Sequence, residues 1–154
     1  MSTNSLGLPL PLPITATFAL PLTLYYLLLQ SRVVAQRVRT KTIIAQQTTK
    51  PTTTSSSEQA DPLFIATRSQ SNFVENVPLA LLLSAFVELN NGSQKILTIA
   101  LGALTIARVL HVEAGLLVKG NKGRGRPVGF LTTLGVNLGL AGYGAWLVRG
   151  YWGF

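Results

Sequence analysis

Cysteine is absent from this chain of 154 residues, and histidine occurs only once. The lack of cysteine excludes a disulfide framework, a thiolate metal site and a cysteine nucleophile. A single histidine cannot build a metal site that needs several histidines from one chain. We therefore expect no metal cofactor.

Charge is also scarce. Charged residues make up 12% of the chain, whereas soluble domains carry about 25%. Hydrophobic residues make up 47%, and the mean hydropathy is +0.38. A small soluble protein must cover most of its surface with polar groups, so a disordered chain and an ordinary water-soluble enzyme both match poorly. The composition predicts an integral membrane protein.

Acidic residues are particularly few, five against 13 lysines and arginines, which gives a net charge of +8. A basic balance of this size can indicate nucleic-acid binding. Here the basic residues cluster beside apolar segments, as membrane insertion alone predicts. We expect membrane lipids, and no nucleic acid, among the partners.

Long apolar runs, by contrast, are abundant. Each run can supply the roughly 20 residues that a helix needs to cross a membrane. Lipid offers no hydrogen-bond partner for unpaired backbone groups, so we expect each run to be a helix. A cleaved signal peptide is the weaker interpretation of the first run, because the first 31 residues contain no lysine or arginine. We expect an all-α, single-domain protein over residues 1–154, a four-helix transmembrane bundle with spans at about 13–30, 63–89, 96–118 and 128–148.

The connections between the runs differ in charge. The first, residues 31–62, is polar, and its middle (48–57) is rich in threonine and serine. The second is a short turn around Gly92, and the third, residues 119–126, is basic and rich in glycine. The first and third connections carry nine of the 13 basic residues. The positive-inside rule therefore places both in the cytoplasm and both termini on the opposite side.

Polar side chains interrupt two of the apolar runs. Arg68, Asn72 and Glu75 are spaced i, i+4 and i+7, and Arg108 and His111 are spaced i and i+3, so each set shares a helix face. A lone charge at mid-membrane costs about 2.5–3.5 kcal/mol, so these groups must pair, line a cavity or lie near the headgroups. One stripe alone is equally compatible with a structural tie between helices. Two stripes near the basic end favour a pocket for an anionic, polar ligand, although a lone histidine is more often a packing residue than a catalyst.

Three segments of the chain share a family pattern. Residues 68–78 read R-x-Q-x-N-x-x-E-x-x-P, residues 107–111 read A-R-V-L-H and are followed by Gly115, and residues 126–132 read R-P-V-G-F-L-T. In this order they resemble the second, third and fourth helices of the MAPEG family, the membrane-associated proteins of eicosanoid and glutathione metabolism. The histidine form of the third segment is similar to bacterial-type members.

This resemblance implies a homotrimer that binds glutathione, as a co-substrate, at the interfaces between subunits, open to the cytoplasm. In a eukaryotic cell the expected membrane is that of the endoplasmic reticulum. Arg68 would hold a carboxylate of the tripeptide, since arginine suits bidentate carboxylate binding. Glu75 would pair with the γ-glutamyl ammonium, and Gln70 and Asn72 would hydrogen-bond the peptide or each other.

The resemblance also implies roles for four further residues. Arg126 matches the arginine that stabilises the thiolate, because a nearby positive charge lowers a thiol pKa from about 8.5. Arg37 would reach in from the neighbouring subunit. Arg108 and His111, on the third-helix segment, are assigned to glutathione binding.

The chain also departs from the family pattern. Asn76, His111 and Gly115 stand where several eicosanoid-forming members have tyrosines that grip glutathione. These departures argue against a dedicated leukotriene or prostaglandin synthase.

Two functions remain in competition. The leading hypothesis is a glutathione-dependent transferase or peroxidase that acts on a lipophilic electrophile, with the thiol arriving from the cytoplasm and the electrophile from the bilayer. The alternative is a non-catalytic member of the same fold that binds a partner protein or a lipid. A small transporter is less favoured, because the sequence contains no broken helix pair or inverted repeat.

Overall fold

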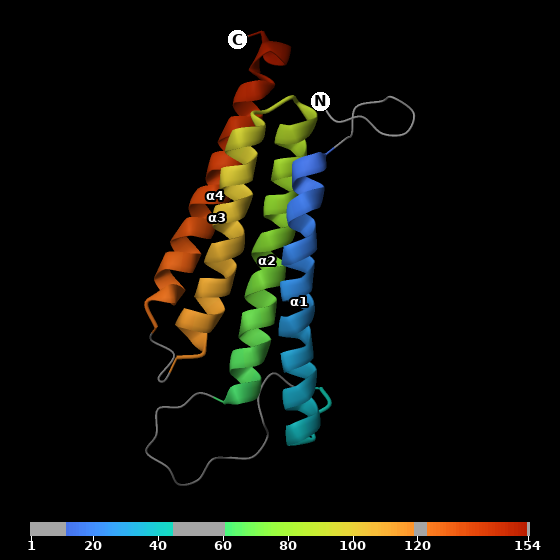
Figure 1. Cartoon of the computed structure of the whole chain (residues 1–154), viewed down its shortest axis with the longest axis vertical. Helices are drawn as coiled ribbons and strands as arrows, with labels where there is room; N and C mark the ends of the chain where they lie inside the picture. Colours follow the sequence, from blue (N-terminus) through green and yellow to red (C-terminus); the bar gives the residue numbers. More distant parts are fainter. Residues whose placement is uncertain (1–11, 45–60, 119–122, 154) are drawn as a thin grey trace.

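A computed structural model describes residues 12–44, 61–118 and 123–153 of the protein. These residues form four long helices (Figure 1). No strand occurs within these described ranges. The helices are α1 (Pro13–Thr40), α2 (Pro62–Leu89), α3 (Gln94–His111) and α4 (Gly125–Leu147), with a π-helical turn η1 (Val112–Leu116) and a 3₁₀ turn η3 (Arg149–Trp152).

The helices form an antiparallel bundle in which α1 packs on α2, α2 on α4, α4 on α3 and α3 on α1 (Figure 1). The end of α1, the start of α2, η1 and the start of α4 lie at one end of the bundle, and the turn between α2 and α3 lies at the other. The first of these ends is called the basic end below, because Arg37, Arg39, Arg124 and Arg126 lie there.

Each of the four helical segments is long and apolar enough to cross a membrane, with η1 extending the third to Leu116. Leucine, valine and phenylalanine fill the space between the helices, as at Leu22, Phe73 and Leu104. Many other large apolar side chains point outward, among them Leu24, Ile99 and Leu138. In water such a surface would be costly, whereas a lipid environment solvates it. The prediction of an all-α, four-helix membrane bundle is confirmed.

The helix ends differ in places from the predicted spans. Helix α1 starts at Pro13, a favourable first position for proline, but continues to Thr40, ten residues beyond the predicted end. Residues 31–40 contain no glycine or proline, so the polar start of the first connection can extend the helix beyond the apolar run. The helix then ends at Lys41, whose φ of 54° is left-handed. The threonine- and serine-rich segment 48–57 lies outside the described residues, as do Lys119 and Lys122 of the third connection.

Candidate functional site

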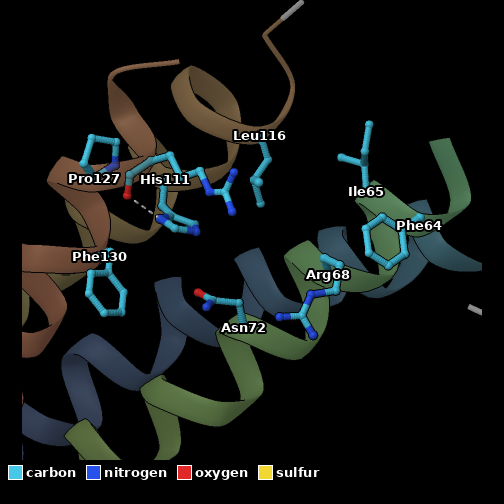
Figure 2. Close-up of a pocket in the computed structure, with 9 residues that line it drawn as sticks. Phe64, Ile65, Arg68, Asn72, His111, Leu116, Pro127 and Phe130 are labelled. Carbon is cyan, nitrogen blue, oxygen red and sulfur yellow. Dashed lines mark hydrogen bonds between the residues drawn. The ribbon is translucent and has the colours of Figure 1, made fainter. Parts of the chain in front are cut away.

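A cavity of about 570 Å³ opens at the basic end of the bundle, between α2, η1 and α4 (Figure 2). Its size lies within the range of small-molecule sites, about 300–1,000 Å³. Four of its nine lining residues are polar: Arg68, Asn72, His111 and Arg126. The other five are apolar: Phe64, Ile65, Leu116, Pro127 and Phe130.

The first turns of α2 supply one wall of this cavity. Asp61 begins the helix by accepting a hydrogen bond from the Leu63 N–H at 2.9 Å, a normal N-cap contact. Arg68 and Asn72 follow one turn apart, so both point toward the cavity (Figure 2). Arg68 is exposed and forms no ion pair among the described residues. Its guanidinium is therefore available to a ligand.

Arg108 lies behind the cavity rather than in its lining. Its side chain is only 2% exposed. Its Nη1 donates to Asn72 Oδ1 at 2.7 Å, and its Nη2 donates to the Gly129 carbonyl at 3.0 Å. One buried guanidinium thus joins α2, α3 and α4, and it holds the Asn72 amide in a fixed orientation. Arg108 therefore positions a lining residue, Asn72, and does not itself belong to the cavity lining.

His111 is held against the start of α4. Its Nδ1 lies 3.0 Å from the carbonyl oxygen of Arg126, and its ring extends into the cavity (Figure 2). The approach of the two helices depends on glycine. A Cβ added at Gly129 would lie 2.5 Å from the His111 Cβ, and one at Gly115 would lie 2.6 Å from the Arg126 N. A tyrosine at position 115 therefore has no room, which gives a physical reason for this departure from the family pattern.

The π-helical turn η1 places neighbouring residues on opposite sides of the third segment. Leu116 reaches the cavity, whereas Glu113 faces α1, where its Oε1 accepts from Arg32 Nη1 at 2.6 Å and from the Tyr25 hydroxyl at 3.3 Å. Both members of the ion pair are partly exposed. The pair therefore ties α1 to η1 outside the cavity.

Three of the predicted site residues lie away from this cavity. Glu75 is exposed on α2, and Gln70 is half-buried on the same helix. Arg37 lies near the end of α1, where its Nη1 donates to the Ile43 carbonyl at 3.2 Å. None of the three belongs to the cavity lining. Of the predicted site residues, the cavity of one chain thus brings together Arg68, Asn72, His111 and Arg126.

The apolar wall was missed by the sequence reasoning, although the spacing carried a signal. Phe64 and Ile65 precede Arg68 by four and three residues, and Phe130 follows Arg126 by four. Residues at these spacings share a helix face. The same rule that grouped the polar residues would have identified these three.

The charge of the cavity is one-sided. Its described lining contains two arginines and no aspartate or glutamate. The first turn of α4 also borders it, and the N-terminal end of a helix carries a partial positive charge. This arrangement suits an elongated ligand that has anionic groups together with an apolar portion. No group of three or more metal-ligating side chains occurs in the part of the chain that the structure describes.

Comparison with known proteins supplies one positive finding. The model of the MAPEG family matches residues 15–146, a region that includes almost all of the four helices and every residue of the cavity. A comparison with curated proteins finds no match to the chain. Because the family model covers most of the chain, this multi-pass membrane protein belongs to the MAPEG family, the four-helix membrane proteins of eicosanoid and glutathione metabolism.

Proposed function

We propose that the protein is a glutathione-dependent transferase or peroxidase that acts on a lipophilic electrophile. The cavity carries this proposal: it combines Arg68, Arg126, Asn72 and His111 with an apolar wall at one end of a membrane bundle. Glutathione presents two carboxylates, an ammonium and a thiol. Two guanidinium groups match its anionic groups, because arginine binds carboxylates through paired N–H donors.

Each polar residue has a role in this proposal. Arg68 holds a carboxylate of the tripeptide, and Asn72, oriented by Arg108, donates its free Nδ2 hydrogens to the peptide. Arg126 stabilises the thiolate, since a nearby positive charge favours the ionised thiol. The electrophile enters from the bilayer along Phe64 and Phe130, which border the same cavity.

The described lining residues of one chain offer no acidic partner for the ammonium of glutathione. Glu75 is exposed on the same helix, seven residues after Arg68. We propose that a homotrimer completes the site, with Glu75 and Gln70 beside the subunit interface and Arg37 contributed by the neighbouring subunit. The basic connections would face the cytoplasm, where glutathione is supplied, in agreement with the positive-inside rule.

Titration calorimetry of the detergent-purified protein with glutathione tests binding, and a panel of apolar electrophiles tests thiol conjugation and peroxide reduction. We expect saturable heat with glutathione and a weaker response with Arg68→Ala. Ophthalmic acid, which replaces the thiol by a methyl group, is the matched control ligand: it should bind but support no reaction. No heat and no thermal stabilisation at millimolar glutathione would contradict the proposal.

One observation favours a second candidate function. Gly115 leaves no room for a tyrosine that grips glutathione in other members, so the fold could be retained for binding a partner protein or a lipid. This non-catalytic function predicts no conjugation with any electrophile in the panel. Its distinguishing result is a protein that folds normally, binds no glutathione and is stabilised by a co-purifying partner or lipid.

A further inference from the structure

The hydrogen bond of His111 determines which of its ring nitrogens carries a hydrogen. The partner of Nδ1, 3.0 Å away, is the backbone carbonyl oxygen of Arg126. A carbonyl oxygen can only accept, so Nδ1 must carry the hydrogen. In the neutral imidazole the other nitrogen, Nε2, is then an acceptor with a free lone pair. The ring extends into the cavity (Figure 2), so this lone pair is available to a bound ligand.

Of the lining residues that the structure describes, His111 is also the only proton acceptor. Of the nine lining residues, five are apolar, Asn72 carries a neutral amide, and Arg68 and Arg126 remain protonated in proteins. Among the lining residues that the structure describes there is no carboxylate, lysine or tyrosine. Among the described lining residues, His111 is therefore the side chain that can take a proton from a ligand inside the cavity.

We infer that His111 is a catalytic residue, the general base that takes the thiol proton of glutathione. This inference rests on the proposed function and adds a proton acceptor to it. His111 Nε2 removes the proton as the S–H bond breaks, and the sulfur electron pair forms a bond to carbon of an α,β-unsaturated carbonyl or an epoxide. In the unsaturated carbonyl, the C=C π pair shifts so that the negative charge ends on the carbonyl oxygen, which gives an enolate. In the epoxide, the pair of the broken C–O bond stays on oxygen, which gives an alkoxide. His111 then returns the proton to the enolate or alkoxide, so charge and atoms balance.

The surroundings of the ring favour the second step of this cycle, the release of the proton. Arg108 lies one turn before His111 on α3, Arg126 lies at the start of α4, and Arg68 faces the cavity from α2. The positive charges of Arg108 and Arg126 favour the return of the proton from the ring once the thiolate has been consumed. Arg126 and His111 have separate roles in this step: Arg126 stabilises the sulfur anion, and His111 moves the proton. General-base catalysis of this kind contributes about 10²–10⁴-fold to a rate.

Two variants separate the proton transfer from the structural contact of His111. An asparagine can place an amide N–H near the position of Nδ1, so His111→Asn keeps a donor for the Arg126 carbonyl but removes the base. His111→Phe removes both. The kcat/KM for glutathione with an apolar α,β-unsaturated carbonyl should fall about 100-fold in His111→Asn at pH 7. At pH 9.5, where the free thiol with a pKa of about 8.5 is largely ionised, the loss should shrink to less than about 10-fold. A loss of equal size at both pH values, or no loss, would overturn the inference.

A second measurement does not depend on glutathione. Because the chain contains one histidine, ¹⁵N-histidine labelling gives a spectrum with a single imidazole. We expect the hydrogen on Nδ1 and none on Nε2 at pH 7.5, and the opposite tautomer would overturn the inference. If the wild-type protein binds no glutathione, the proposed function fails, and the tautomer measurement still decides whether His111 offers a base to the cavity.

Discussion

Glu88, in the last turn of α2, accepts two hydrogen bonds from Thr15, in the first turn of α1. Its Oε2 lies 2.9 Å from the Thr15 backbone N and 2.7 Å from the Thr15 Oγ1. Its Oε1 accepts a third bond from the Ile14 N–H at 2.8 Å. Helix α1 has no capping side chain at Leu12, so a carboxylate from another helix satisfies its first amides and lies at the positive end of its dipole.

This contact predicts the effect of removing the carboxylate. Glu88→Ala should lower the free energy of unfolding by about 1–2 kcal/mol, the usual value of an N-cap. Thr15→Val should cost less, because the two backbone bonds remain. Unfolding of the purified protein in mixed micelles, followed by circular dichroism, measures both. In a double-mutant cycle, the double variant should lose less unfolding free energy than the sum of the two single losses. Strict additivity would contradict the contact.

Two arginines of the sequence motifs should respond differently to substitution. Arg108 is buried and donates to Asn72 Oδ1 and to the Gly129 carbonyl, which also accepts from Thr133 Oγ1. Arg108→Ala therefore leaves Asn72 Oδ1 unpaired and should lower the free energy of unfolding by about 1–3 kcal/mol. Arg68 is exposed in the cavity, so Arg68→Ala should change stability by less than about 0.5 kcal/mol.

Glutathione titration completes this comparison. Arg68→Ala should weaken binding at least tenfold while the protein remains folded. Loss of stability in Arg68→Ala without loss of affinity would instead identify Arg68 as a structural residue, and the cavity would then lack its carboxylate contact.

Glycines of α4 offer a matched test of the close contact with α3. An alanine at Gly129 would place a Cβ against His111 and within 2.6 Å of the Ala107 carbonyl, whereas one at Gly135 meets nothing within 4 Å. Gly129→Ala should therefore destabilise by about 1–3 kcal/mol through overpacking. Gly135→Ala should be neutral or stabilising by up to about 1 kcal/mol, the helix propensity difference. Clear destabilisation by Gly135→Ala would indicate that another copy of the chain packs on this face.

Sequence alone was sufficient to predict the four helices and less of the site. Apolar runs of about 20 residues determine spanning helices, and the spacing of Arg68 and Asn72 was enough to place both on one face. The spacing of residues along a helix does not show how deeply each side chain is buried. Arg108 and His111 share a face, but contact with Gly129 buries the first behind the cavity and Figure 2 shows the second inside it. The positions of Glu75 and Arg37 relative to a ligand depend on a neighbouring subunit, whose arrangement no pattern within one chain specifies.

Arg126 allows chemistry to be separated from folding and binding. Its side chain is exposed at the mouth of the cavity, so Arg126→Ala should leave the unfolding transition almost unchanged. If its charge stabilises the thiolate, removing it favours the neutral thiol, and the pKa of bound glutathione must rise. Turnover near pH 7 should then fall while glutathione affinity changes little, because the thiolate fraction at a fixed pH decreases.

The absorbance of the bound thiolate against pH measures this pKa directly. Arg124→Ala is the matched control, because Arg124 is exposed two residues earlier and does not line the cavity. It should preserve both the thiol pKa and the turnover. A thiol pKa that stays constant in Arg126→Ala, with turnover also preserved, would remove Arg126 from the mechanism. An effect confined to Arg124→Ala would move the role to that arginine.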